Sequence, residues 1–191
     1  MCRAFYADGV SRTVRFSGTV LAASAVLLAL VGCAAADGTD GAAAVVAPAP
    51  AAAAAEVCDA VDAALPERVE GQERVDGADL PAYVAVWGDP AIVLRCGVPL
   101  PLVLTPGEEG YDPLADAVDV NGVSWLLEDA PGGGKLFTTT HRTVHVEVSV
   151  PADYAPEVNP LVDLAEAIAG QVPLDELYAQ EELYGAPPAG L

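Results

Sequence analysis

Two histidines, His141 and His145, are the only imidazoles in the chain, and they lie four residues apart. On a helix this spacing would place both rings on one face, where they could share a metal ion. The alternation of valine with polar residues over 144–150 predicts a strand instead, which separates the two rings by about 13 Å. We therefore expect no metal site and no cofactor, and we expect both histidines on an exposed sheet surface.

Other motifs that could support catalysis are incomplete. Gly132-Gly133-Gly134-Lys135 lacks the first glycine and the final hydroxyl residue of a phosphate-binding loop, and Ser124 and Ser149 lack the glycines of a nucleophile elbow. Asp119–Gly122 starts like a calcium loop, but glycine comes at its fourth position instead of its sixth. We therefore assign no catalytic residue, and weak calcium binding by acidic loops stays open.

The charge of the chain excludes one class of partner. Its 191 residues include 28 Asp and Glu against 8 Lys and Arg, which gives a formal net charge of −20. Such a surface repels phosphate backbones, so we expect no nucleic-acid partner. Because carboxylates are so abundant, a hydrolase with acidic catalytic residues remains the alternative to a binding protein.

The N-terminal segment predicts export. Three arginines within the first fifteen residues precede Phe16–Ala36, which carries no charged residue. A basic start followed by an apolar run is typical of a signal peptide. Leu30-Val31-Gly32-Cys33 resembles a bacterial lipobox, which implies cleavage after Gly32 and a lipid anchor on Cys33.

An uncleaved transmembrane anchor is the alternative, since about 20 apolar residues suffice to span a bilayer. Both interpretations place the remainder of the chain at the outer face of the plasma membrane, because the arginines stay inside.

The rest of the chain is predicted to form one domain. We assign 1–32 to the signal peptide, 33–55 to an Ala/Pro-rich spacer, 56–173 to a single domain and 174–191 to an acidic tail, for which a frayed helix is one interpretation. Poly-alanine at 51–55 leaves open a helix that starts before Glu56. Amphipathic patterns predict helices over 56–65 and from Asn159, which we place at the N-cap, to about residue 170. We interpret 67–80 as a loop.

Strands are predicted over 83–87, 92–96, 118–120, 123–127, 135–140 and 144–150. Asn121-Gly122 is the strongest hairpin signal among them. The expected fold is α+β: a mostly antiparallel sheet of about five to six strands with two helices packed on one face.

Of the four cysteines, Cys2 lies in the signal segment and Cys33 is the predicted lipid site, so Cys58 and Cys96 remain in the exported domain. Thiol pairs outside the cytoplasm normally oxidise, which predicts a disulfide. Two unrelated buried thiols are the alternative.

Three segments carry a family resemblance: WGDPAIVLRCGVP at 87–99, VNGVSWL at 120–126 and VPADYAPEVNPLVDLA at 150–165. Together they resemble DUF3515, an actinobacterial envelope family of unknown function. The resemblance implies an N-terminal membrane segment or lipobox and the cysteine pair. Its members tend to be encoded near a D-alanine–D-alanine ligase, which associates them with cell-wall synthesis. It implies no catalytic residues.

These observations predict a membrane-tethered, non-enzymatic binding or accessory module of the cell envelope. Its partners would be cell-wall or envelope proteins. We place the partner contact in the first of the three segments, at Trp87 and Arg95. Arg95 is the only cation in that segment, and the strand alternation points it away from the face of Cys96.

Overall fold

The computed structural model describes residues 45–77 and 80–184, with side chains described up to residue 180. All of these residues belong to one compact unit, residues 42–191. The predicted signal peptide, Cys2, Cys33 and the first part of the predicted spacer lie outside the described residues, so the lipid anchor stays a prediction.

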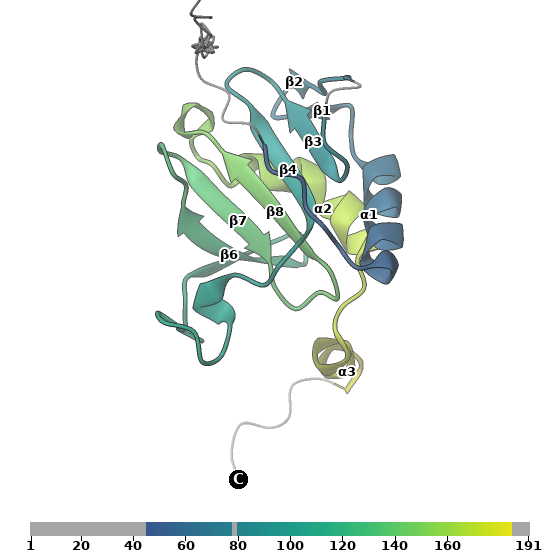
Figure 1. Cartoon of the computed structure of the whole chain (residues 1–191), viewed down its shortest axis with the longest axis vertical. Helices are drawn as coiled ribbons and strands as arrows, with labels where there is room; N and C mark the ends of the chain where they lie inside the picture. Colours follow the sequence, from purple (N-terminus) through teal and green to yellow (C-terminus); the bar gives the residue numbers. More distant parts are fainter. Residues whose placement is uncertain (1–44, 78–79, 185–191) are drawn as a thin grey trace, which may run out of the picture. The chain divides into compact units, whose positions relative to one another are not determined.

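A six-stranded antiparallel sheet forms the centre of the domain, with strand order β3-β4-β8-β7-β6-β5 (Figure 1). Its strands are β3 (Val84–Trp87), β4 (Ile92–Val98), β5 (Ala117–Val120), β6 (Val123–Asp129), β7 (Lys135–Thr139) and β8 (His145–Val150). The predicted α+β class is therefore confirmed. The predicted hairpin joins β5 to β6, where Asn121 and Gly122 both have positive φ, 50° and 79°.

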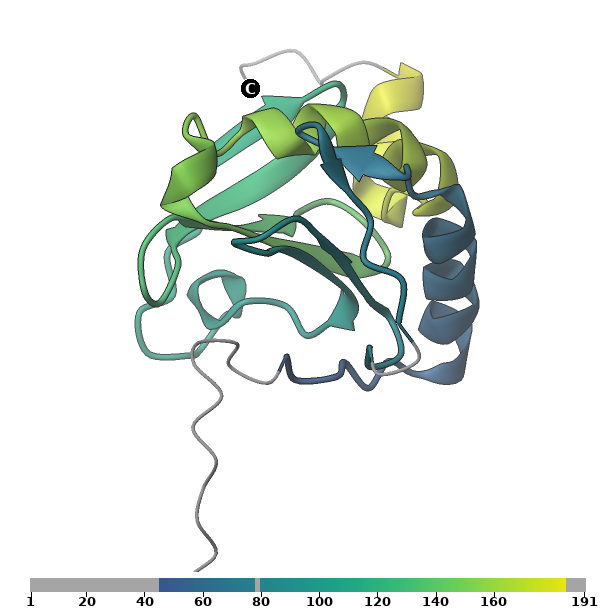
Figure 2. The same ribbon diagram turned by 90° about the horizontal axis from the view of Figure 1, so that it is seen from above.

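Two helices, α1 (Ala52–Ala64) and α2 (Asn159–Gln171), pack against each other and cover one face of the sheet. Figure 2 shows α2 on one side of the sheet and the segment with the short helix η1 (Leu102–Leu104) on the other. Helix α1 starts at Ala52 rather than Glu56, since poly-alanine has the highest helix propensity.

The predicted start of α2 is wrong by one residue. The N-cap position is Val158 rather than Asn159, and no side chain caps the helix. A short helix η2 (Ala152–Tyr154) precedes α2, and a turn that bonds Asn159 N–H to Pro156 O leads into it. The acidic tail, for which a frayed helix was one interpretation, contains a third helix, α3 (Glu176–Tyr184).

The predicted loop 67–80 contains a small hairpin of β1 (Arg68–Val69) and β2 (Gln72–Glu73). Long-range contacts stabilise it, because Val69 is fully buried in the core and Arg74 bridges to Trp87 of the main sheet. Two-residue strands with a single apolar side chain give no periodic signal, which explains why the pattern missed them.

Side chains alternate across the sheet as the sequence predicts. Along β8, Val146, Val148 and Val150 are buried, while the residues between them are half-buried. The valines face the helices, and the intervening residues face the opposite side. We call this opposite side the far face of the sheet.

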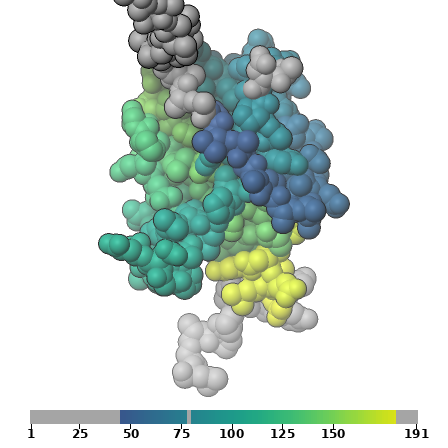
Figure 3. All heavy atoms as spheres, in the orientation of Figure 1, coloured from purple at the N-terminus to yellow at the C-terminus, as the bar shows by residue number. Residues whose placement is uncertain are grey.

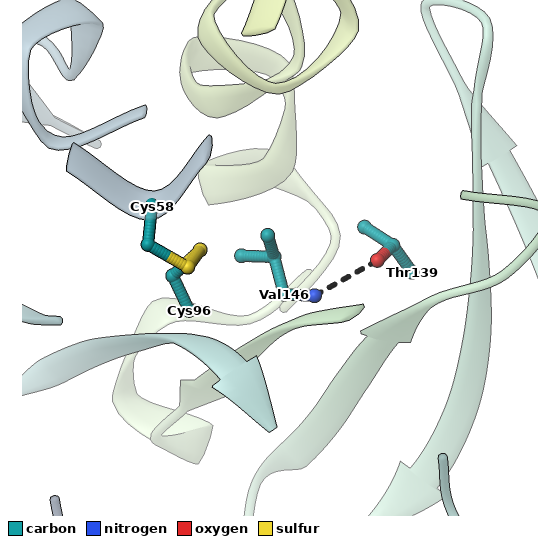
Figure 4. Close-up of a disulfide and its surroundings, with 4 residues drawn as sticks. All are labelled: Cys58, Cys96, Thr139 and Val146. Carbon is teal, nitrogen blue, oxygen red and sulfur yellow. Dashed lines mark hydrogen bonds between the residues drawn. A yellow bond between two sulfur atoms is a disulfide. The ribbon is translucent and has the colours of Figure 1, made fainter. Parts of the chain in front are cut away.

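A disulfide between Cys58 and Cys96 joins α1 to β4 on the helical face, which confirms the predicted pair (Figure 4). The Cα atoms lie 5.6 Å apart, and both residues are almost completely buried. Close by, Thr139 Oγ1 accepts a hydrogen bond of 2.9 Å from Val146 N–H, which ties β7 to β8.

Residues 45–51 run over the far face before α1 begins, and Figure 3 shows their atoms on the surface. Pro50 packs over Gly97, where an added Cβ would lie 2.6 Å from Pro50 Cβ. Arg95 Nη1 donates to Val46 O over 3.3 Å. The last part of the predicted spacer is therefore packed against the domain.

Candidate functional site

The first of the three family segments is largely structural. Trp87 is fully buried, and its indole Nε1 donates to Pro66 O over 3.1 Å. A partner that docks on the folded domain cannot reach this ring. The structure therefore assigns Trp87 to the core and corrects its predicted place in a contact surface.

The turn after Trp87 packs against another of the family segments. The Tyr154 hydroxyl donates to Pro90 O over 2.7 Å. A Cβ at Gly88 would lie 2.6 Å from this same hydroxyl, so the close approach requires glycine. Folding requirements account for these residues without a ligand.

Arg95 points to the far face as predicted, but it is not an unpaired surface cation. Its Nε donates to Glu147 Oε1 over 2.7 Å, and the two side chains are 26% and 15% exposed. Arg95 thus holds β4, β8 and the segment 45–51 together on this face. A role of Arg95 in partner binding stays a prediction.

A cavity of about 470 Å³ lies on the far face, at the end of the sheet away from the β1–β2 hairpin. Its outer wall is the segment 100–117, which includes η1, and we call this segment the roof. The roof contributes Leu100, Leu104, Tyr111, Pro113, Ala115 and Ala117. The floor consists mainly of Ser124, Leu126, Thr140 and His145.

A second hollow of about 780 Å³ adjoins this cavity, and both are lined by Ser124, Thr140, His141, Arg142 and Tyr178. Both histidines of the chain therefore line one cavity, which the sequence did not predict. Both can line it because His141 lies in the connection before β8 and not on the strand.

Helix α3 positions His141. The imidazole stacks on the Tyr178 ring, with ring centroids 3.5 Å apart and an angle of 18° between the planes. Asp175 N–H donates to His141 O over 3.0 Å, and Asp175 Oδ1 accepts from the backbone N–H groups of Leu177 and Tyr178. The predicted tail is therefore part of the cavity wall.

Arg142 stabilises this part of the cavity wall from inside the fold. Its guanidinium is almost completely buried and donates to Val172 O at 2.7 Å and to Gly122 O at 3.0 Å. These bonds attach the end of α2 to the β5–β6 hairpin. The cavity is thus formed by parts of the chain that are distant in sequence.

His145 is oriented by its backbone neighbour. Its Nδ1 lies 3.1 Å from Thr139 O. A carbonyl oxygen only accepts, so Nδ1 carries the proton and Nε2 keeps its lone pair in the neutral ring. The side chain therefore presents a hydrogen-bond acceptor.

Thr140 contributes a polar group without a partner. Its hydroxyl is buried and has no hydrogen-bond partner among the described residues. Such a group is costly in a folded protein and is normally explained by an interaction not yet seen. Thr140 lines the cavity, so a molecule bound there would supply the missing partner, whereas Trp125 Nε1 and Thr138 Oγ1, which are buried without a partner in the same way, are not among the cavity residues.

The roof exposes apolar side chains to solvent. Leu102 is 66% exposed and Leu114 is 88% exposed, and Tyr111 on the same segment is also exposed. Exposed apolar residues that form a contiguous patch often mark an interaction site. The roof thus carries exposed apolar side chains, and the floor of the cavity carries hydroxyl groups.

A pair of carboxylates occupies another part of the far face. Burial, and secondly the negative charge of Glu147, raise the pKa of Glu128. Such an arrangement can provide an acid catalyst. Neither residue is among those that line the two cavities described above.

Within 45–77 and 80–184, no helix is long and apolar enough to cross a membrane. In the same part of the chain, no group of three or more His, Cys, Asp or Glu side chains could hold a metal ion.

The described residues thus form a small α+β domain that is cross-linked by a disulfide and has a cavity at one end of its sheet. The chain belongs to the family described as "Protein of unknown function (DUF3515)", whose model matches residues 18–177. No curated protein and no solved structure matches the chain.

Proposed function

We propose that this protein is a membrane-tethered, non-enzymatic binding module of the cell envelope, and that the cavity under the roof is its binding site. A lipid on Cys33 would hold it at the outer face of the plasma membrane. The observation that carries the proposal is the cavity itself, where a buried hydroxyl of Thr140 has no partner among the described residues.

The disulfide supports an extracytoplasmic location. Bonds of this kind form and persist in oxidising compartments and are rare in the cytosol. The Cys58–Cys96 bond is enclosed in the core between α1 and β4, as expected of a structural cross-link. This agrees with the export signal expected from residues 1–32.

The alternative is an envelope hydrolase with acidic catalytic residues. The observation that favours it is the raised pKa of Glu128 beside Glu147. We prefer the binding module because these carboxylates are not part of the cavity lining, and because Glu147 already forms an ion pair with Arg95.

Photo-crosslinking in native membranes tests the proposal. A photoreactive amino acid replaces Tyr111 at the roof, and in a control protein it replaces Val162, an exposed residue of α2. We expect one adduct of defined mass at position 111 and none at position 162. Equal labelling at both positions, or none at either, would contradict the proposal.

A further inference from the structure

We infer that the cavity binds a small neutral molecule with an apolar body and one amide or hydroxyl group. His145 accepts a hydrogen bond from that group, and the hydroxyls of Thr140 and Ser124 donate to its oxygen. This inference rests on the proposed binding function and specifies the ligand class.

The hydrogen bond at Nδ1 of the His145 ring determines that Nε2 is the acceptor. Because Nδ1 of His145 donates to Thr139 O, Nε2 is left with a lone pair. None of the described residues hydrogen-bonds this nitrogen. A ligand N–H or O–H group satisfies it, whereas a bare carboxylate offers only acceptors.

Two hydroxyls supply donors at the same floor. Ser124 is half-buried and lines both hollows. Thr140 lines the same cavity, and its buried hydroxyl would donate to a ligand once a rotation about χ1 turns it toward the cavity. An amide or alcohol oxygen accepts from either group.

The remaining lining favours an apolar body. Leu100, Leu104 and Leu126 contribute aliphatic walls. A planar or branched group of moderate size fits such a hollow, since ligand sites are mostly apolar with a few placed polar groups.

Charge and desolvation together disfavour ionic ligands. The net charge of −20 repels anions at long range. The same charge attracts cations, but the carboxylate of Asp175, the acidic side chain that lines this cavity, already accepts two backbone hydrogen bonds at the start of α3. A neutral ligand avoids both the repulsion and the cost of removing a charge from water.

The test uses three probes of one shape: benzamide, benzoate and benzylamine. Because the chain has two histidines, selective nitrogen-15 labelling of histidine in the full-length protein gives two imidazole spectra. The measurement is made at about pH 8 for all three probes, so that benzoate is an anion and benzylamine is mostly a cation. We expect benzamide to shift the His145 nitrogens saturably, at lower concentration than either ion.

Two failures are distinguishable. Tighter binding of benzoate or benzylamine in the cavity would overturn the neutral ligand class and leave the binding site standing. No shift of either histidine with any of the three probes would overturn both the ligand class and the proposed site.

Substitutions test the two hydroxyls. Ser124→Ala and Thr140→Val should each weaken benzamide binding about fivefold to tenfold, which is the usual effect of one lost hydrogen bond. Ser149→Ala is the matched control, because Ser149 is also half-buried on the far face and is not among the cavity residues. Unchanged affinity in Ser124→Ala and Thr140→Val would overturn the role of the hydroxyls. If Thr140→Val does not fold, Ser124→Ala decides alone.

Discussion

Loss of the Cys58–Cys96 bond should destabilise the domain strongly. The two residues are separated by 38 positions, so the bond closes a long loop in the unfolded chain. The chain-entropy relation gives about 4 kcal/mol for a loop of this length. For a domain of this size, that corresponds to a decrease in Tm of roughly 10–15 °C.

The assay compares thermal unfolding of the oxidised protein with protein that was unfolded, reduced and refolded under reductant. The double variant Cys58→Ala/Cys96→Ala is the control, since reductant should not change its Tm. Both thiols are buried, so the variant also loses sulfur packing and should be no more stable than the reduced protein. Oxidised and reduced proteins that melt within about 2 °C of each other would refute this reasoning.

Three other predictions concern the tether and the far face. Cys33→Ala should abolish incorporation of a labelled fatty acid and leave a longer, unprocessed chain; a variant processed to the normal size would contradict the lipobox. Arg95→Glu places a second carboxylate beside Glu147 and should lower Tm by about 5 °C, whereas Arg95→Met should lower it less. Glu128→Gln should raise Tm at about pH 7, because ionisation of Glu128 destabilises the folded state above its raised pKa. That gain should disappear as the pH falls below the ordinary value of 4.5, where both states are protonated.

Local signals predicted much of the main sheet. Asn121-Gly122 identified the β5–β6 hairpin because both positions accept positive φ. The alternating valines of 144–150 identified β8 and its buried face because strand side chains have a period of two. The disulfide was predicted from the expected compartment and from the position of the two other cysteines.

The cavity could not be predicted in the same way. Its floor comes from β6 and β8, its roof from an irregular segment rich in proline, and one wall from a helix in the predicted tail. Helix α3 has no apolar stripe that periodicity could detect, and it is positioned through Asp175 and the stacking of Tyr178 on His141. Contacts between distant segments leave no pattern in a single sequence.

The packing of the family segments has a consequence for mutational work. Contacts within the fold hold Trp87, Gly88 and Tyr154 in place. The Trp87 indole donates to Pro66 O, and the Tyr154 hydroxyl donates to Pro90 O and lies close to Gly88. Substitutions there should therefore reduce the amount of folded protein before they affect binding. Substitutions in the roof and the floor of the cavity distinguish an effect on binding from an effect on folding more clearly.

Native mass spectrometry of the protein extracted from its own membrane tests the central claim most directly. Ala117→Trp fills the cavity from β5, where Ala117 is exposed, and Val162→Trp adds the same ring to α2 as a control. We predict one bound small molecule in the wild-type and Val162→Trp proteins and none in Ala117→Trp. The bare mass of the chain in all three proteins would contradict the claim that this cavity is a binding site.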